Sequence, residues 1–162
     1  MKRAETARIL KNARLWITDV GDVRYAFTSY WASPLPACVA GLLEHWNLTP
    51  EPGSYEFDGL RATRSPAEVP DVAKLLVDLP KEPSVTPVMH GGQHSFVVTP
   101  GKEMIAIMTN GTDDIFVNHD YLNIATDDKW PIRLMACVSP RKPLAIWDGP
   151  KATIIMPIRL AS

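Results

Sequence analysis

The sequence predicts a mixed α/β fold of the α+β kind, in which antiparallel strands joined by tight turns dominate and the helices are short. Helix-like and strand-like patterns alternate through the first half of the chain. A run of hairpin patterns fills the second half, where Asn110-Gly111 and Asp148-Gly149 are typical hairpin turns. A hydrophobic content of 46% and a charged content of 22% are those of a soluble globular domain.

The first half is expected to contain three helices and two hairpins. Residues 3–14 are good helix formers, with Ala4, Ala7 and Leu10 on the inward side. Ser33-Pro34 predicts the start of a second helix, because a cap residue precedes a proline in the first turn. The remaining elements are expected as strands at 15–18 and 24–30, a second helix reaching residue 46, a hairpin over 55–57 and 60–63, and a helix within 69–79.

Pro80, Pro83 and Pro87 predict a stiff linker over residues 80–88. It would separate an N-terminal portion, residues 1–79, from a C-terminal portion, residues 89–162. In the second portion the strands are expected at 95–99, 104–109, 114–118, 132–138, 144–147 and 153–159, with a short helix near 119–125.

Length and charge limit the possible functions. The 162 residues suffice for one domain or two small ones, and a net charge of −1 gives no general basicity for nucleic acid. No apolar run approaches the ~18 residues of a membrane span, and no secretory signal is present, so no membrane partner is expected. Cys38 and Cys137 lie in apolar stretches without metal-ligand spacing, which favours buried free thiols in a reducing cytoplasm; a disulfide is the alternative.

The N-terminal segment concentrates positive charge. On a continuous helix, Arg8, Lys11 and Arg14 would share one face. Such a face attracts the DNA backbone without reading sequence, whereas the alternative is an ordinary solvated helix face. The candidate DNA-binding residues are Lys2, Arg3, Arg8, Lys11 and Arg14.

The last strand pattern, residues 152–160, is unusually apolar for a chain end. In one continuous strand Ile154, Met156, Ile158 and Leu160 would point to the same side. Pro157 lacks a backbone donor and belongs on an edge or beyond the last ladder bond. The segment is therefore either a core strand that completes a sheet or the wall of a pocket.

The ending Met156-Pro157-Ile158-Arg159-Leu160 resembles the C-terminus of bacterial DNA sliding clamps, the ring-shaped processivity factors of replicative polymerases. In that family a Met-Pro-x-Arg-Leu ending closes a groove that receives short peptides from polymerases and the clamp loader. Asn118–Leu122 is similar to the start of the family's last helix. Ser139–Ile146 resembles its Asp-Pro-x-Lys-Pro-x-x-Ile pattern, with Ser139 replacing the acid, and Val69–Val72 resembles its Phe-Pro-Asp-Tyr linker without the aromatic residues.

The resemblance implies a clamp-like fold with antiparallel sheets outside and short helices on the inner face. It implies a processivity factor without enzymatic activity, metal or cofactor, which forms a ring around duplex DNA and tethers a polymerase. Family subunits carry three similar domains, so this chain would be a reduced or phage-type relative that closes its ring by homo-oligomerisation. Its implied groove consists of Ile154, Met156, Pro157, Ile158, Arg159 and Leu160 on one wall and Thr28, Pro70, Lys74 and Leu75 on the other.

Two functions of other classes stay open. The chain could be a clamp-mimicking adaptor or inhibitor that captures replication proteins of a host. It could also be a small metal-dependent hydrolase that uses His90 and His94, with His119-Asp120 completing the site. Gly91-Gly92 argues against a helix at this histidine pair, and a polar hairpin turn is the alternative interpretation of residues 90–94.

Overall fold

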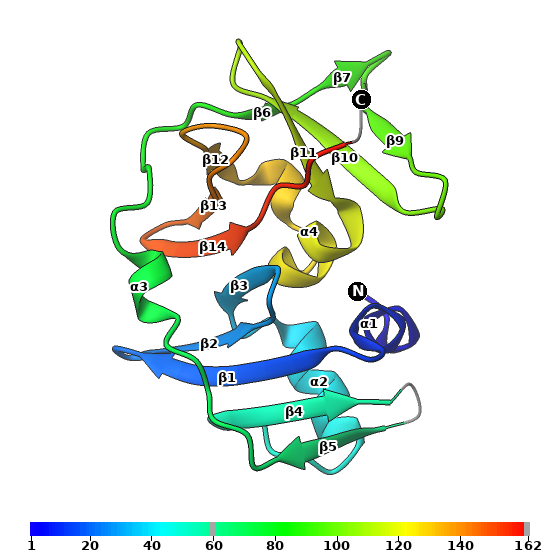
Figure 1. Ribbon diagram of the computed structural model, residues 1–162, viewed down its shortest axis with the longest axis vertical. Coiled ribbons are helices and arrows are strands. Elements are labelled where there is room, and N and C mark those ends of the chain that lie inside the picture. Colours follow the sequence, from blue (N-terminus) through cyan, green and yellow to red (C-terminus); the bar gives the residue numbers. More distant parts are fainter. Residues whose placement is uncertain (59–60, 161–162) are drawn as a thin grey trace.

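An eight-stranded antiparallel sheet takes strands from both ends of the chain (Figure 1). The computed structural model describes residues 1–58 and 61–160. The strand order in this large sheet is β12-β13-β14-β3-β2-β1-β4-β5. Its strands are β1 (Arg14–Val20), β2 (Val23–Phe27), β3 (Trp31–Pro34), β4 (Gly53–Phe57), β5 (Ala62–Ser65), β12 (Leu134–Ala136), β13 (Leu144–Asp148) and β14 (Lys151–Ile155).

A smaller sheet forms around β10 (Met104–Thr109). One edge of this strand pairs with β11 (Asp114–Asn118). The other edge pairs with β9 (Phe96–Val98) near its start and with β6 (Thr86–Pro87) near its end. The predicted Asn110-Gly111 turn joins β10 to β11, and Asn110 Oδ1 accepts the amide protons of Thr112 and Asp113 at 2.9 and 2.7 Å. A separate hairpin consists of β7 (Met89–His90) and β8 (Gln93–His94).

Three short helices, α1 (Arg3–Leu10), α2 (Ala37–His45) and α4 (His119–Thr126), pack into the main core on one face of the large sheet. Successive strand residues point to opposite faces, so Leu15 and Ile17 face this core while Trp16 faces the other side. A second, smaller core on that other side lies against residues 69–79, which include α3 (Ala73–Leu76). Among the described residues every strand pairing is antiparallel, so the predicted α+β class is confirmed.

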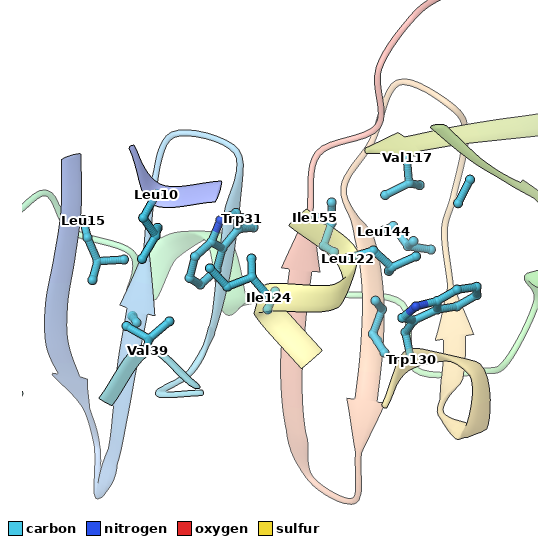
Figure 2. Close-up of a cluster of buried hydrophobic side chains, with 14 of the residues drawn as sticks. Leu10, Leu15, Trp31, Val39, Val117, Leu122, Ile124, Trp130, Leu144 and Ile155 are labelled. Carbon is cyan, nitrogen blue, oxygen red and sulfur yellow. The ribbon is translucent and has the colours of Figure 1, made fainter. Parts of the chain in front are cut away.

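Helix α4 fills the centre of the main core. Asn118 caps it, because its Oδ1 accepts the Tyr121 amide at 3.1 Å, and the short helix predicted here is confirmed. Leu122 and Ile124 are fully buried. Figure 2 shows Ile124 next to Trp31 of β3, whereas Leu122 lies toward Leu144 of β13. One helix therefore packs against strands from both ends of the chain.

The predicted helix start at Ser33-Pro34 is wrong, because these residues end strand β3. Ser33 is buried, and its hydroxyl donates to the Ala125 carbonyl of α4 at 2.5 Å while accepting from Thr153 Oγ1 of β14 at 3.1 Å. These bonds satisfy a polar group that burial would otherwise destabilise. Helix α2 begins only at Ala37, after Pro36.

Helix α1 is shorter than the predicted 3–14. It ends at Leu10, because Asn12 adopts a left-handed backbone with φ of 62° and donates its amide to the Phe57 carbonyl at 2.8 Å. The chain then enters β1 at Arg14. The predicted helix within 69–79 is likewise reduced to the four residues of α3, and Asp78 beyond it has a φ of 61°.

The proline-rich segment 80–88, expected as a linker, lies against the large sheet. Val85 is buried and forms a bridge with Met135 of β12. Trp147 Nε1 donates to the Pro80 carbonyl at 2.9 Å. The portions before and after this segment share one sheet, since β14 pairs with β3.

Both cysteines are free, as expected: Cys38 is half-buried and Cys137 is buried. None of the helices in the described part of the chain has the length and apolar character needed to cross a bilayer.

We expect both thiols to resist alkylation in the native protein. Burial, helped by the nearby Asp127 carboxylate, raises the pKa of Cys38 to about 12, and burial also raises the pKa of Cys137. Because the thiolate is the reactive species, labelling by a disulfide reagent at about pH 8 should be slow and should become fast only after unfolding. Rapid modification of the folded protein would contradict this placement of the thiols.

Candidate functional site

An apolar pocket of about 330 Å³ opens on the side of the large sheet that carries the second core. Segments far apart in the sequence form it: the β2–β3 turn, the α3 region, the start of β13 and the end of β14. Its lining residues are Phe27, Thr28, Ser29, Tyr30, Trp31, Ala32, Val72, Leu75, Pro143, Ile154 and Met156.

The second core forms the floor of this apolar pocket. Phe27, Ala32, Val72 and Ile154 are all buried and pack on one another. Strand alternation explains the direction of Phe27, Ala32 and Ile154, because their immediate neighbours Ala26, Trp31 and Ile155 belong to the main core on the opposite face. The floor is therefore fixed by the same alternation that builds the sheet.

The rim of the apolar pocket consists of large side chains that stay open to solvent. Leu75 is 55% exposed, Tyr30 54% and Met156 41%. Contiguous exposed apolar groups beside a hollow are typical of ligand and protein contact sites. Met156 adds an unbranched thioether that can adapt to differing partners.

Four of the expected groove residues, Thr28, Leu75, Ile154 and Met156, line this pocket. Pro70 and Lys74 are exposed and are not among its lining residues, whereas the neighbouring Val72 is. Val72 and Pro143 belong to strings that carry the clamp resemblance, but only the packing of α3 and β13 on β14 shows that they reach the pocket.

The expected continuous strand over 152–160 is wrong, because β14 ends at Ile155. The Met156 amide donates to the Tyr30 carbonyl at 3.0 Å, and after Pro157 the tail crosses to the smaller sheet, where the Ile158 amide donates to the Phe116 carbonyl at 2.8 Å. Proline cannot continue the ladder with β3. The residues that consequently leave the pocket are Pro157, Ile158, Arg159 and Leu160.

A polar pocket of about 700 Å³ adjoins the apolar one. The two share Thr28–Trp31, and the polar pocket is completed by residues 9–14 and Tyr121. Tyr30 stands between them, with its ring stacked on Tyr121 at a centroid distance of 5.3 Å and an angle of 10°. Burial raises the pKa of Tyr121, which keeps this hydroxyl neutral.

The five basic residues expected to face DNA do not share one helix face. Arg14 lies on β1 and pairs with Glu56 of β4, while Arg8 on α1 forms a bidentate pair with Asp120 of α4 at 3.1 and 3.2 Å. Lys2, Arg3 and Lys11 are exposed. The end of α1 at Leu10 is the physical reason for the separation.

Carboxylates in and directly after α4 also offset positive charge at the N-terminus of the chain. The amino group of Met1 lies 3.0 Å from Asp128 and 3.6 Å from Asp127, which directly follow α4. Together with the Arg8–Asp120 pair, these contacts commit part of the N-terminal charge to partners within the chain.

The histidine pair lies on the β7–β8 hairpin, not on a helix. Cross-strand partners are Met89 with His94 and His90 with Gln93, so His90 and His94 point to opposite faces of the hairpin. His94 packs on Trp130 at 4.8 Å between ring centroids. Within residues 1–58 and 61–160, no group of three or more possible ligands is placed to hold a metal ion.

His119 packs nearby in an aromatic cluster. Its ring meets Phe96 edge-on at a centroid distance of 4.9 Å, and Asn123 Nδ2 lies within 3.4 Å of both ring nitrogens. Burial lowers the pKa of His119 from its ordinary value of 6.5; His94 acts in the same direction, whereas Asp120, Asp128 and Glu5 oppose the shift.

We expect His119 to make the protein less stable in mild acid. Its pKa is lower in the folded state, so the unfolded chain takes up the proton first and stability is lost as pH falls through about 6.5. Urea unfolding between about pH 7.5 and 5.5 should show a weaker pH dependence for His119→Gln than for the parent. His45→Gln, at an exposed position, is the matched control; equal slopes in all three proteins would refute this role.

Comparison of the chain with protein-family models, with curated proteins and with solved structures finds no match. The function proposed below therefore rests on the geometry of the two pockets and on the clamp-like strings in the sequence.

Proposed function

We propose that the protein is a sliding-clamp-like, non-enzymatic replication factor that captures short apolar segments of polymerases or clamp-loader proteins in the apolar pocket. The observation that carries the proposal is the convergence of the β2–β3 turn, Leu75, Ile154 and Met156 around one hollow. The clamp resemblance names these same segments as the two walls of a peptide groove. The antiparallel sheets with short helices on one face of the large sheet are compatible with a clamp-like fold.

The pocket has the physical properties that such recognition requires. A buried floor surrounded by an exposed apolar rim suits one or two large side chains of an otherwise extended peptide. A ligand Leu or Phe would remove Leu75, Tyr30 and Met156 from water and displace little ordered polar structure. Most of the affinity would come from these few anchors.

Two substitutions at the rim should weaken peptide binding without unfolding the protein. Leu75→Glu and Met156→Glu introduce a charge at exposed positions, so stability should change by only about 0.5 kcal/mol. Affinity for a Gln-x-x-Leu-Phe peptide should fall about thirtyfold, roughly 2 kcal/mol, because a charge would lie against the apolar anchors. Fluorescence anisotropy with a labelled peptide measures the change.

Val77→Glu is the matched control, because Val77 is 64% exposed just beyond α3 and does not line the pocket. A chain that stops after Met156 should also keep its affinity, since the removed Ile158 bridges Phe116 of β11 and does not line the pocket. If the parent protein gives no titratable signal at millimolar peptide, or if Val77→Glu weakens binding as much as Leu75→Glu does, the site assignment fails.

A homo-oligomeric ring around duplex DNA is the second part of the proposal. The large sheet ends at β5 on one side and at β12 on the other, where the Val85–Met135 bridge already occupies part of the outer edge. Edge strands that keep free backbone groups are templates for pairing with another chain. Ile132, Leu134 and Val138, on and around β12, are all more than half exposed. A head-to-tail contact between such edges would close a ring of several copies. Lys2 and Arg3 on the helical side would then contact the phosphate backbone weakly enough to slide.

The ring predicts a multi-copy particle whose hold on DNA is topological. Light scattering at high micromolar concentration should give several times the monomer mass, and protein retained on nicked circular DNA should be released when the circle is cut. Binding should be independent of sequence and should weaken steeply with salt. A strict monomer that still binds the peptide would exclude the ring and favour the clamp-mimicking adaptor.

A further inference from the structure

Two cationic side chains, Lys11 and Arg14, line the polar pocket beside the apolar one. Both pockets share Thr28–Trp31, so the polar pocket lies next to a peptide that fills the apolar one. The lining residues of the two pockets, in the described part of the chain, include no carboxylate. The combined surface is apolar at one end and positive at the other.

The positive charge of the polar pocket is only partly neutralised. Arg14 pairs with Glu56, which comes from β4 and does not line this pocket. Lys11 is exposed and forms no ion pair within residues 1–58 and 61–160. At the apolar pocket, exposed Lys74 and Lys142 directly precede the lining residues Leu75 and Pro143.

Asp71 is the acidic residue closest in sequence to a lining residue of the apolar pocket, and its carboxylate already accepts a hydrogen bond within the chain. Asp71 precedes Val72, and its Oδ1 accepts the Ala73 amide at 2.9 Å at the start of α3. Asp120 and Glu103 lie close enough to act on Tyr121 of the polar pocket, and Asp120 is paired with Arg8. Among the residues that line the two pockets, the charged side chains are the cations Lys11 and Arg14, although the chain as a whole has a net charge of −1. An occupant with negative charge next to its apolar anchors is complementary to this surface.

We propose that the peptide partner of the apolar pocket carries acidic residues beside its apolar anchors, and that Lys11 and Arg14 select it. This inference rests on the proposed peptide-binding function and specifies the chemistry of the partner. The apolar anchors supply affinity, whereas charges at the margin supply discrimination and a faster association rate. Lys11 and Arg14 thereby belong to partner selection, and the possible DNA contacts at the N-terminus are reduced to Lys2, Arg3 and Arg8.

Three labelled peptides with one Leu-Phe anchor, flanked on both sides by Asp, Asn or Lys, test the selection. At low ionic strength the Asp peptide should bind the parent about threefold more tightly than the Asn peptide for each cation engaged, and the Lys peptide should bind more weakly than either. Salt at about 0.15 M should reduce the difference between the Asp and Asn peptides and leave binding of the Asn peptide nearly unchanged.

Lys11→Glu should reverse the order of the Asp and Lys peptides, and the milder Lys11→Gln should remove part of the preference. Glu56→Gln should increase the preference for Asp, because it frees Arg14 from its partner. Lys81→Glu, an equal charge change at an exposed position outside both pockets, is the control and should leave the preference intact. Thermal melting of each variant confirms folding.

The outcomes separate this inference from the function on which it rests. Equal affinity of the parent for the Asp and Asn peptides at low salt overturns the selection and leaves the apolar pocket intact. A preference that persists in folded Lys11→Glu and does not grow in Glu56→Gln also overturns it. Failure of all three peptides to bind overturns both proposals.

Discussion

The fold depends on the burial of α4 between strands that come from opposite ends of the chain. Leu122 and Ile124 have no exposed surface, and the carbonyl of Ala125, in the same helix, is bonded to the Ser33 hydroxyl of β3. Strands β3 and β14 are both short, and the helix stabilises their pairing by packing on both of them. Burial of several large side chains at about 1.5–3 kcal/mol each makes the helix a major contributor to stability.

The apolar pocket is a consequence of this arrangement. When β3 and β14 are joined through α4 on one face, Ala32 and Ile154 meet on the other face and create a floor. The β2–β3 turn and the Met156 backbone are then tied together by one hydrogen bond at the pocket margin. The floor of the site is therefore built largely on paired strands, whereas its rim comes from the β2–β3 turn, the α3 region and Met156. A floor of this kind favours a preformed surface with low ordering cost on binding.

Local signals in the sequence predicted the elements whose cause is local. The short helix near 119–125 and the Asn110-Gly111 turn are specified within a few residues, and both appear as expected. The failures have non-local causes: Ser33 is held in a strand by partners on α4 and β14, and Asn12 is turned by the carbonyl of Phe57. The pocket also combines residues that the sequence predicted with residues that it did not. The C-terminal pattern predicted Met156 as a groove residue, whereas Val72 and Pro143 reach the pocket only through tertiary packing.

The pairing of β3 with β14 also has a consequence for the order of folding. Ser33 and Thr153, which touch in the native core, are 120 positions apart along the chain. During synthesis β3 is made well before β14, and one of its edges stays without this partner until Lys151–Ile155 has left the ribosome. Contacts of such long sequence separation form slowly, and an unpaired apolar strand can associate with other nascent chains meanwhile. Truncated products of this gene would carry that open edge permanently, so premature termination should yield aggregates rather than a smaller folded domain.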